Sequence, residues 1–314
     1  MQKITIEGNA AVTKRRLALS LPRRTTVRRY LLFFALIAPA FILRFITAAY
    51  PIAQTVLYSF TNYNLLKGTN EFIGFENYSA LTTDFGVRGA LSFTIVYVLA
   101  STFIELAVGM MIALLLNANF RGRAFARTIN LIPWAIPTIV AGYAFRWFLD
   151  DQFGLLTNWI NAITGKHMLA FIDPTGAKLS VILVHVWKDA PFMAIIFLAG
   201  MQGVPEDLYE AAKIDGASAW QRFWSITIPL VKPLVITMTL FRIVWSLSGF
   251  DLVYGLTSGG PGVATSVLAL QVFREGILYF KFGFASAISV VLLLFVALVG
   301  IIALRLYRRA DVAY

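Results

Sequence analysis

The sequence predicts an all-α fold, a bundle of about six transmembrane helices with both termini in the cytoplasm. Of its 314 residues, 59% are hydrophobic and 14% are charged, with a mean hydropathy of +0.74. Soluble domains carry about 25% charged residues, so the apolar excess indicates a polytopic membrane protein. Six segments are also apolar over the roughly 20 residues that a helix needs to cross a bilayer. Finally, most lysines and arginines lie in alternate loops.

The six apolar segments set the expected organisation of the chain. The third contains Pro133 and Pro137 beside Trp134, which favours a bent helix. The expected spans are Tyr30–Ser59, Gly89–Leu116, Thr128–Leu149, Leu179–Met201, Pro233–Thr257 and Ala285–Leu306. They form one transmembrane domain over residues 30–306 that includes a cytoplasmic hairpin at 203–232. A basic N-terminal segment (1–29) and a short cytoplasmic tail (307–314) flank it.

Positive charge orients these spans, because loops on the cytoplasmic side of a membrane carry an excess of Lys and Arg. Seventeen of them fall in the two termini and in the loops after the second and fourth spans, whereas the opposite loops hold six. This bias places both termini inside and accounts for the net charge of +11 without a nucleic-acid partner. Segment 1–29 does not have the form of a cleavable signal. A basic surface helix and a disordered segment both remain open for it.

Several classes of chemistry are excluded by composition. The chain has no cysteine, and its two histidines, His167 and His185, stand far apart without a ligand pattern, so no metal site is expected. No phosphate-binding loop motif occurs, and the Gly-rich stretch at 258–262 is typical of a turn. The loops are too short for a catalytic domain. We therefore expect no catalytic residue and no cofactor bound by this chain.

The segment 203–232 has the signals of a helical hairpin. Pro205 and the acidic pair Glu206–Asp207 suit the first turn of a helix. Gly216 is a plausible C-cap, and Ser218 with Gln221 has the form of a capping box for a second helix. The first helix carries an apolar stripe of Leu208, Ala211 and Ala212. The second carries an aromatic side of Trp220, Phe223 and Trp224, which is expected to rest on the membrane domain. Pro229 and Pro233 are expected to separate this second helix from the fifth span. A passive loop is one interpretation; docking of a helix into a groove of a partner protein is the other.

The hairpin also resembles a known signature. Residues 210–217 (EAAKIDGA) and 226–230 (ITIPL) are similar to the EAA motif of ABC importer permeases, with Ile228 in place of a leucine. Residues 72–78 (FIGFENY) resemble an element of the first outer loop of sugar-type permeases, and residues 256–261 (LTSGGP) resemble one after their fifth span. The likeness covers about residues 30–310. The chain is thus identified as a member of the binding-protein-dependent, sugar-type permeases.

This resemblance implies partners and roles. A second, homologous permease subunit, usually different in sequence, would complete the pathway in a bacterial inner membrane. A dimer of P-loop ATPase subunits would bind ATP and Mg²⁺, and an extracytoplasmic solute-binding protein would deliver a sugar-like substrate. The coupling helix would comprise Glu210, Ala211, Ala212, Asp215, Gly216 and Ala217. In it Glu210 would contact the ATPase, the alanines would allow close approach and Gly216 would allow the turn.

Polar residues inside the spans are the remaining candidates, because charges in a bilayer are costly and often functional. Glu105 suits either a buried ion pair or the pathway. Lys188 and Asp189 interrupt the fourth span and are expected to have different partners, and Pro191 is expected to kink it. The fifth span has Arg242 followed by aromatic, hydroxyl and carboxylate groups that suit a polyol. The predicted pathway residues are Trp245, Ser246, Ser248, Gly249, Phe250 and Asp251, with Ser286 and Ser289 as weaker candidates.

Two other functions fit the sequence less well than that of an importer permease. A stand-alone secondary transporter would show internal repeats with broken helices at matching positions, and no repeat relates the two halves. An integral membrane enzyme would need a cluster of His or acidic residues at one interface. The sequence does not name the solute, and it leaves open whether this subunit or its partner contacts it.

Overall fold

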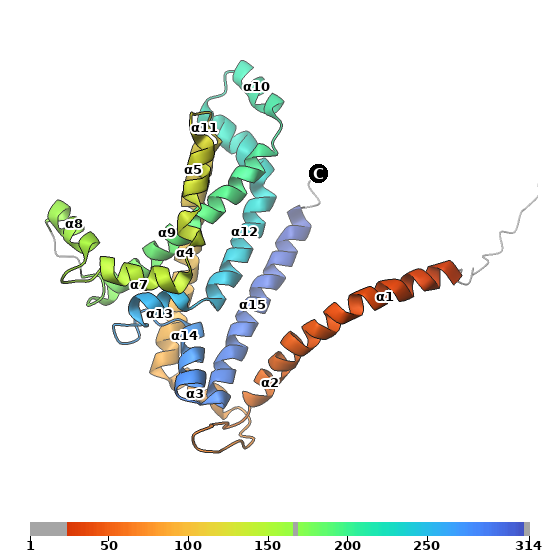
Figure 1. The fold of residues 1–314 in the computed structure, drawn as a ribbon, viewed down its shortest axis with the longest axis vertical. Helices are drawn as coiled ribbons and strands as arrows, with labels where there is room; N and C mark the ends of the chain where they lie inside the picture. The colour runs from red at the N-terminus through yellow and green to blue at the C-terminus, as the bar shows by residue number, and fades with distance from the viewer. Residues whose placement is uncertain (1–23, 166–168, 311–314) are drawn as a thin grey trace, which may run out of the picture. The chain divides into compact units, whose positions relative to one another are not determined.

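The computed structural model describes residues 24–165 and 169–310, with the side chains of 24–27 and 306–310 left aside (Figure 1). His167 and residues 1–23 of the basic segment 1–29 lie outside the described residues, and residues 24–29 belong to α1. Within the described ranges every regular element is a helix, which confirms the all-α prediction. The chain divides into two units, Met1–Ala53 and Gln54–Tyr314.

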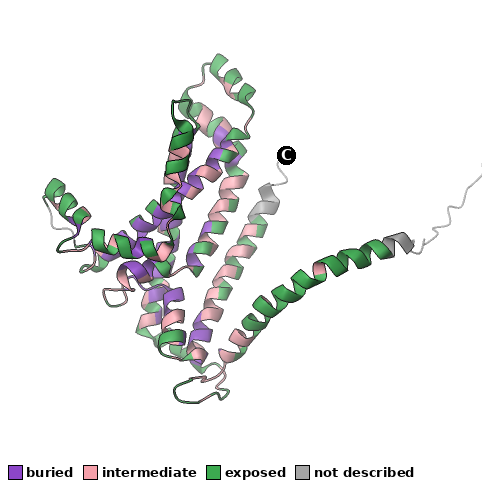
Figure 2. Cartoon of the chain, viewed as in Figure 1, coloured by how far each residue is buried: buried purple, intermediate pink, exposed green. Residues whose placement is uncertain are grey.

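The first unit is helical over its described residues. Helix α1 (Arg24–Arg44) continues through a π-helical turn, η1 (Phe45–Ala49), into α2 (Tyr50–Tyr58). The stretch Arg28–Tyr58 is long and apolar enough to cross a membrane. Its large apolar side chains are exposed (Figure 2), as lipid-facing side chains are.

Four long helices form the frame of the second unit. They are α4 (Phe85–Asn117), α9 (Pro174–Gln202), α12 (Ile228–Ser248) and α15 (Phe282–Ala310). Helices α4 and α9 share the most extensive contact, since Gly109 lets α4 approach the backbone of α9. A Cβ at Gly109 would lie 2.7 Å from the Cβ of Met193. Helix α9 runs unbroken past Lys188–Pro191, and the kink expected at Pro191 stays a prediction.

The third span is bent. Helices α5 (Arg123–Asn130) and α6 (Ile132–Ala135) precede a turn at Ile136–Pro137, and α7 (Thr138–Phe148) leaves at 89° to them. The bend predicted from its prolines is confirmed. With this pair taken as one span, the described residues hold six candidate membrane spans, as expected.

The fifth span differs from the prediction at both ends. Helix α11 (Ala219–Arg222) runs through a π-helical turn, η2 (Phe223–Thr227), straight into α12, so Pro229 and Pro233 do not separate them. Pro229 is the second residue of α12 and directly follows the π-helical turn η2. At the other end α12 stops at Ser248, because Gly249 is extended, and α13 (Asp251–Thr257) begins after it.

Helices α7 and α13, the short halves of the two broken spans, cross at a pair of glycines. A Cβ on Gly255 would lie 2.9 Å from the carbonyl oxygen of Ile139 and 3.2 Å from the Cα of Gly142. Both neighbours are backbone atoms and cannot rotate away. The two breaks are therefore joined to each other by close backbone contact.

Replacing Gly255 by valine is expected to destabilise the folded chain by about 1–3 kcal/mol, because the added atoms overpack this crossing. Thermal unfolding in detergent would measure it. Gly300→Ala in α15 is the control, since a Cβ there meets nothing within 4 Å. Equal melting temperatures for the two variants would contradict the crossing.

The remaining helices are α3 (Glu76–Thr83), α8 (Leu155–Thr164), α14 (Leu268–Phe273) and the π-helical η3 (Arg274–Leu278). Helices α3 and α14 lie at the end of the unit away from α10, and α8 follows α7 (Figure 1). Two of the sequence motifs have structural roles here. The amide of Asn77 donates to the carbonyl oxygens of Ser59 (2.9 Å) and Thr61 (2.8 Å), which holds α3 to the end of α2. The hydroxyl of Thr257 lies 2.7 Å from that of Thr265, which closes the glycine-rich loop.

Candidate functional site

The hairpin at one end of the unit is built by local caps. Helix α10 (Glu206–Ile214) ends at Gly216, whose φ of +78° is the left-handed conformation that glycine adopts easily. The amide of Ala217 donates to the carbonyl of Ala212 (2.9 Å) across this turn. Ser218 and Gln221 form the predicted capping box at the start of α11. The hairpin is confirmed as a structural element.

The surface that the hairpin presents is polar with a few apolar side chains. Glu210, Ala211, Asp215 and Gly216 are exposed, and Ala212 and Ala217 are half-buried. Ile214, between them, is 87% exposed. A single exposed apolar side chain is common on protein surfaces, so the tip of the hairpin is a mainly polar surface.

The hairpin is tied to the membrane helices at its base. The hydroxyl of Tyr209 in α10 lies 2.9 Å from that of Thr227, the last residue before α12. The aromatic side of α11 does not rest on the bundle as predicted, because Trp220 is 69% and Trp224 52% exposed. The rings of Trp220, Phe223 and Trp224 pack against one another instead.

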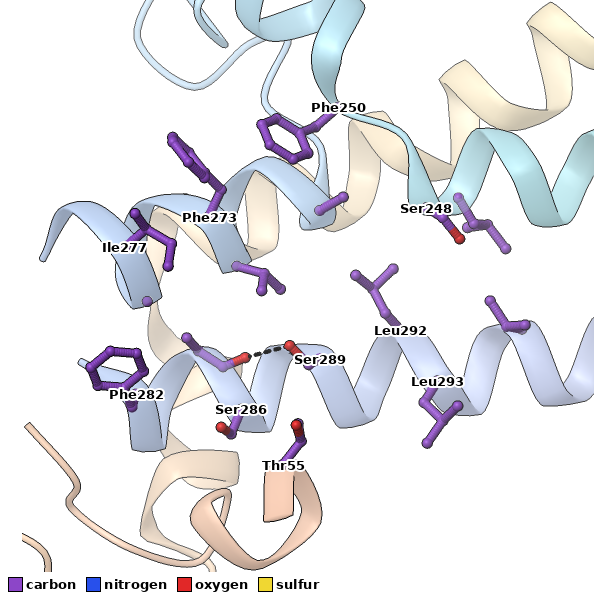
Figure 3. A pocket seen from close by; sticks show the side chains of 16 residues that line it. Thr55, Ser248, Phe250, Phe273, Ile277, Phe282, Ser286, Ser289, Leu292 and Leu293 are labelled. Atoms are coloured by element: carbon purple, nitrogen blue, oxygen red, sulfur yellow. Dashed lines mark hydrogen bonds between the residues drawn. The ribbon is translucent and has the colours of Figure 1, made fainter. Parts of the chain in front are cut away.

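The break between α12 and α13 lies between two cavities. One, of about 650 Å³, is lined by α12, α14, η3 and α15 with Thr55 of α2, and contains Ser248, Phe250, Ser286 and Ser289 (Figure 3). Phe250 stacks on Phe273 across 5.1 Å at its wall. The hydroxyls of Ser248 and Ser289 donate to carbonyls of their own helices, so this cavity is mainly apolar.

The second cavity, of about 320 Å³, adjoins the break on the other side. It is lined by Phe241, Val244, Trp245, Ser248, Gly249 and Asp251. The ring of Trp245 is 60% exposed and packs with that of Phe241 at 5.5 Å. Aromatic faces beside a hydroxyl and a carboxylate are the groups that hold a sugar by stacking and hydrogen bonds. Five of the six predicted pathway residues thus line one or both cavities.

The sixth, Ser246, lies elsewhere. It is 3% exposed, and its hydroxyl oxygen lies 3.5 Å from Nε2 of His185 in α9, away from both cavities. Neighbouring positions on a helix face different directions, so Ser246 points into the bundle while Trp245 points outward.

Ser246 borders a buried charged cluster of Glu105, His185, Lys188, Asp189 and Arg242, none more than 6% exposed. The guanidinium of Arg242 donates to both carboxylate oxygens of Glu105, at 2.8 and 3.1 Å, and to Asp189 at 2.7 Å. As predicted, Lys188 and Asp189 have different partners, since Lys188 donates to the carbonyl oxygen of Trp134 (3.4 Å) and Asp189 accepts from Arg242, but the two also lie 3.5 Å from each other, which was not expected. Glu105 takes the ion-pair role rather than the pathway role.

This cluster has the spacing of a metal site without its chemistry. One ligand atom each from Glu105, His185 and Asp189 lie within 4.8 Å of one another. The guanidinium of Arg242 already bonds both carboxylates, and it is the cation of the group. Sequence reasoning missed His185 as a member because its partners are 57 and 80 residues away in the chain.

Fold and site together define a class of protein: a multi-span membrane permease with a capped polar hairpin at one end. Residues 105–312 match the family described as the binding-protein-dependent transport system inner membrane component. The chain belongs to this family. It is therefore a transport component rather than an enzyme, a permease subunit of an ABC importer in which a separate subunit hydrolyses ATP.

Relatives across bacteria and archaea agree with this assignment. The sulfoquinovosyl glycerol transport system permease of Agrobacterium fabrum is 36% identical over 90% of this chain and 92% of its own length. The trehalose/maltose transport system permease of Thermococcus litoralis is 37% identical over 76% and 80%. A chain of a bacterial alginate ABC transporter shares the fold, with a TM-score of 0.79 and 22% identity over 91% of this chain and 96% of that one.

Proposed function

We propose that this chain moves a sugar or sugar derivative, delivered by a solute-binding protein, across a bacterial inner membrane, with ATP hydrolysis by a dimer of P-loop subunits as the driving force. The observation that carries the sugar assignment is the pair of cavities around Gly249, where Trp245 and Phe250 present aromatic faces beside Ser248 and Asp251. The relatives' printed substrates are sugars or glycosides, which supports the same class.

The hairpin supplies the coupling step in this proposal. Glu210, Ala211, Ala212, Asp215, Gly216 and Ala217 form the surface that enters a cleft on the ATPase. When ATP closes the partner subunits, the hairpin moves with them. Because α11, η2 and α12 are continuous, that motion reaches the break at Gly249 along a single helix. The pathway then changes its side of access.

A second, homologous permease completes the pathway. Trp245 and Asp251 are exposed on this chain, so a partner surface is needed to enclose a solute there. The positive-inside bias places the hairpin and both termini in the cytoplasm.

The test is purification of the tagged chain from detergent-solubilised membranes with whatever accompanies it, followed by reconstitution into proteoliposomes. The expected result is a complex with a P-loop ATPase and a second six-span permease that accumulates a labelled mono- or disaccharide only with ATP and the binding protein. A chain that purifies alone and drives uptake from an ion gradient would instead establish the secondary transporter.

Within that assay, Trp245→Ala is expected to raise the KM for uptake by about threefold to tenfold, since an aromatic stacking contact contributes roughly 0.5–1.5 kcal/mol. Trp159→Ala in α8 is the matched control, because Trp159 is also 61% exposed but lines neither cavity. An unchanged KM for Trp245→Ala would remove this residue from the substrate pathway.

A further inference from the structure

Helix α12 contacts the α4–α9 pair through apolar side chains and through one buried arginine. Near the hairpin, Leu234 packs on the bare backbone of Gly200 in α9. Further along the helix, half-buried Val235 and Met238 pack on the core that α4 and α9 share. Eight residues beyond Leu234, Arg242 is 2% exposed. The apolar contacts hold α12 against the bundle, and Arg242 adds a directional polar contact that fixes its position along the two neighbouring helices.

The polar contact joins three helices through one side chain. Arg242 of α12 bonds Glu105 of α4 through Nε and Nη2, and its Nη2 also bonds Asp189 of α9. A guanidinium presents its donors in a rigid planar fork, so the two carboxylates are held in one geometry. Movement of α12 along either helix must break these bonds.

The hydrogens of the cluster can be assigned so that every group is paired. Arg242 Nη2 has two hydrogens and three acceptors nearby, since Nε2 of His185 also lies 3.0 Å away. A neutral His185 with its proton on Nε2 resolves this, because it donates to Glu105 Oε1 at 3.0 Å. The Tyr97 hydroxyl then donates to Nδ1 at 2.6 Å. We assign this tautomer from the partners.

The charges of the cluster also balance. Glu105 and Asp189 carry one negative charge each, and Arg242 and Lys188 one positive charge each. With neutral His185 the buried group has no net charge. This lowers the cost of burying it, because an unpaired charge is strongly destabilised in a medium of low dielectric constant. In a bilayer, lipid tails are as apolar as the helix surfaces, so helix association gains little free energy from the hydrophobic effect. Polar contacts between helices therefore contribute a larger share of the interactions that hold α12 in place.

We infer that Arg242 is a positioning residue that locks α12 to α4 and α9 as one rigid body, so that hairpin motion is delivered undiminished to the break at Gly249. This inference rests on the proposed function, because the motion it transmits is the one that ATP imposes on the hairpin. Arg242 lies two helical turns before Gly249. Without the Arg242 contacts, α12 would slide along α4 and α9. The hairpin could then move without changing the two cavities around Gly249.

A distance measurement tests the rigid body directly. The chain has no cysteine, so Leu99→Cys in α4 and Thr237→Cys in α12, both exposed positions outside the cavities, can carry spin labels without background. In the assembled complex the distance between the labels is expected to change by less than about 2 Å between nucleotide-free and ATP-bound states. A change approaching one helical turn, about 5 Å, would overturn the inference.

A neutral replacement separates coupling from folding. The double variant Glu105→Leu, Arg242→Met removes the lock and keeps the cluster neutral, because Asp189 stays paired with Lys188 at 3.5 Å, and such neutral replacements are often as stable as the original. It is expected to assemble and melt like the wild type while moving about tenfold fewer sugar molecules per ATP hydrolysed. Arg242→Lys keeps the positive charge but lacks the planar guanidinium, so its ratio of sugar moved to ATP hydrolysed should lie between those of the wild type and the neutral variant.

Three outcomes can be told apart. A double variant that is folded and keeps the wild-type ratio of sugar to ATP overturns the lock and leaves the importer intact. A wild-type complex that shows no ATP-dependent uptake overturns the proposed function, and the inference with it. A double variant that fails to assemble also counts against the inference, because neutral replacement should preserve the fold, and the labelled wild-type chain still reports the distance.

Discussion

Replacing Glu210 by lysine is expected to release the ATPase subunits from the complex while the chain stays folded in the membrane. Glu210 is exposed on α10, so the change meets no buried partner in the chain itself. At a docked surface it places a like charge where the proposed contact needs an acid, which costs at least about 2 kcal/mol, or roughly 30-fold in affinity. Co-purification followed by mass spectrometry measures the loss.

The control for this variant is Glu76→Lys, the same charge change at an exposed site in α3, at the end of the unit away from the hairpin. It should retain the ATPase. Retention of the ATPase by Glu210→Lys, with unchanged ATP-dependent uptake, would remove Glu210 from the coupling surface. The second permease is expected to remain bound in both variants, which shows that the chain is still assembled.

Replacing Arg242 alone by methionine is expected to destabilise the chain by about 3–5 kcal/mol, the usual result of removing one partner from a buried ionic group. Glu105, which is fully buried, and Asp189 would then face each other without the guanidinium. The variant should accumulate poorly and melt well below the wild type in detergent. Thermal unfolding monitored by circular dichroism measures the shift.

Arg44→Met is the matched control, because Arg44 is also an arginine within an apolar span but is exposed. Its loss should change the melting temperature little. Adding Glu105→Leu to Arg242→Met should restore most of the stability, because Asp189 keeps Lys188 as its partner. If Arg242→Met melted like Arg44→Met, the cluster would contribute nothing to holding α12.

Some elements were accessible from the sequence because their signals are local. The caps of the hairpin lie within six residues of one another, from Gly216 to Gln221, and each acts through a backbone group of its own turn. The bend in the third span follows from Pro137, which cannot donate a helical hydrogen bond. The spans follow from their length and apolar composition alone.

The sequence did not predict where the helix of the fifth span begins and where it breaks. Pro229 and Pro233 end a helix in many settings, yet here the π-helical turn before them lets α11 and α12 run together. Gly249 is one glycine among several in apolar sequence. It becomes a break because α13 turns aside to pack on α7 through Gly142 and Gly255, a contact between residues more than 100 positions apart.

By itself the sequence determined the class of fold, the number of spans and the capped hairpin, since composition and short-range hydrogen bonding suffice for these. The tertiary structure alone decided which intramembrane charges pair, why Ser246 faces His185 rather than the cavities, and where α12 stops. Glu105 and Arg242 stand 137 residues apart. Their pairing depends on how three helices pack, and no local pattern in the chain records that.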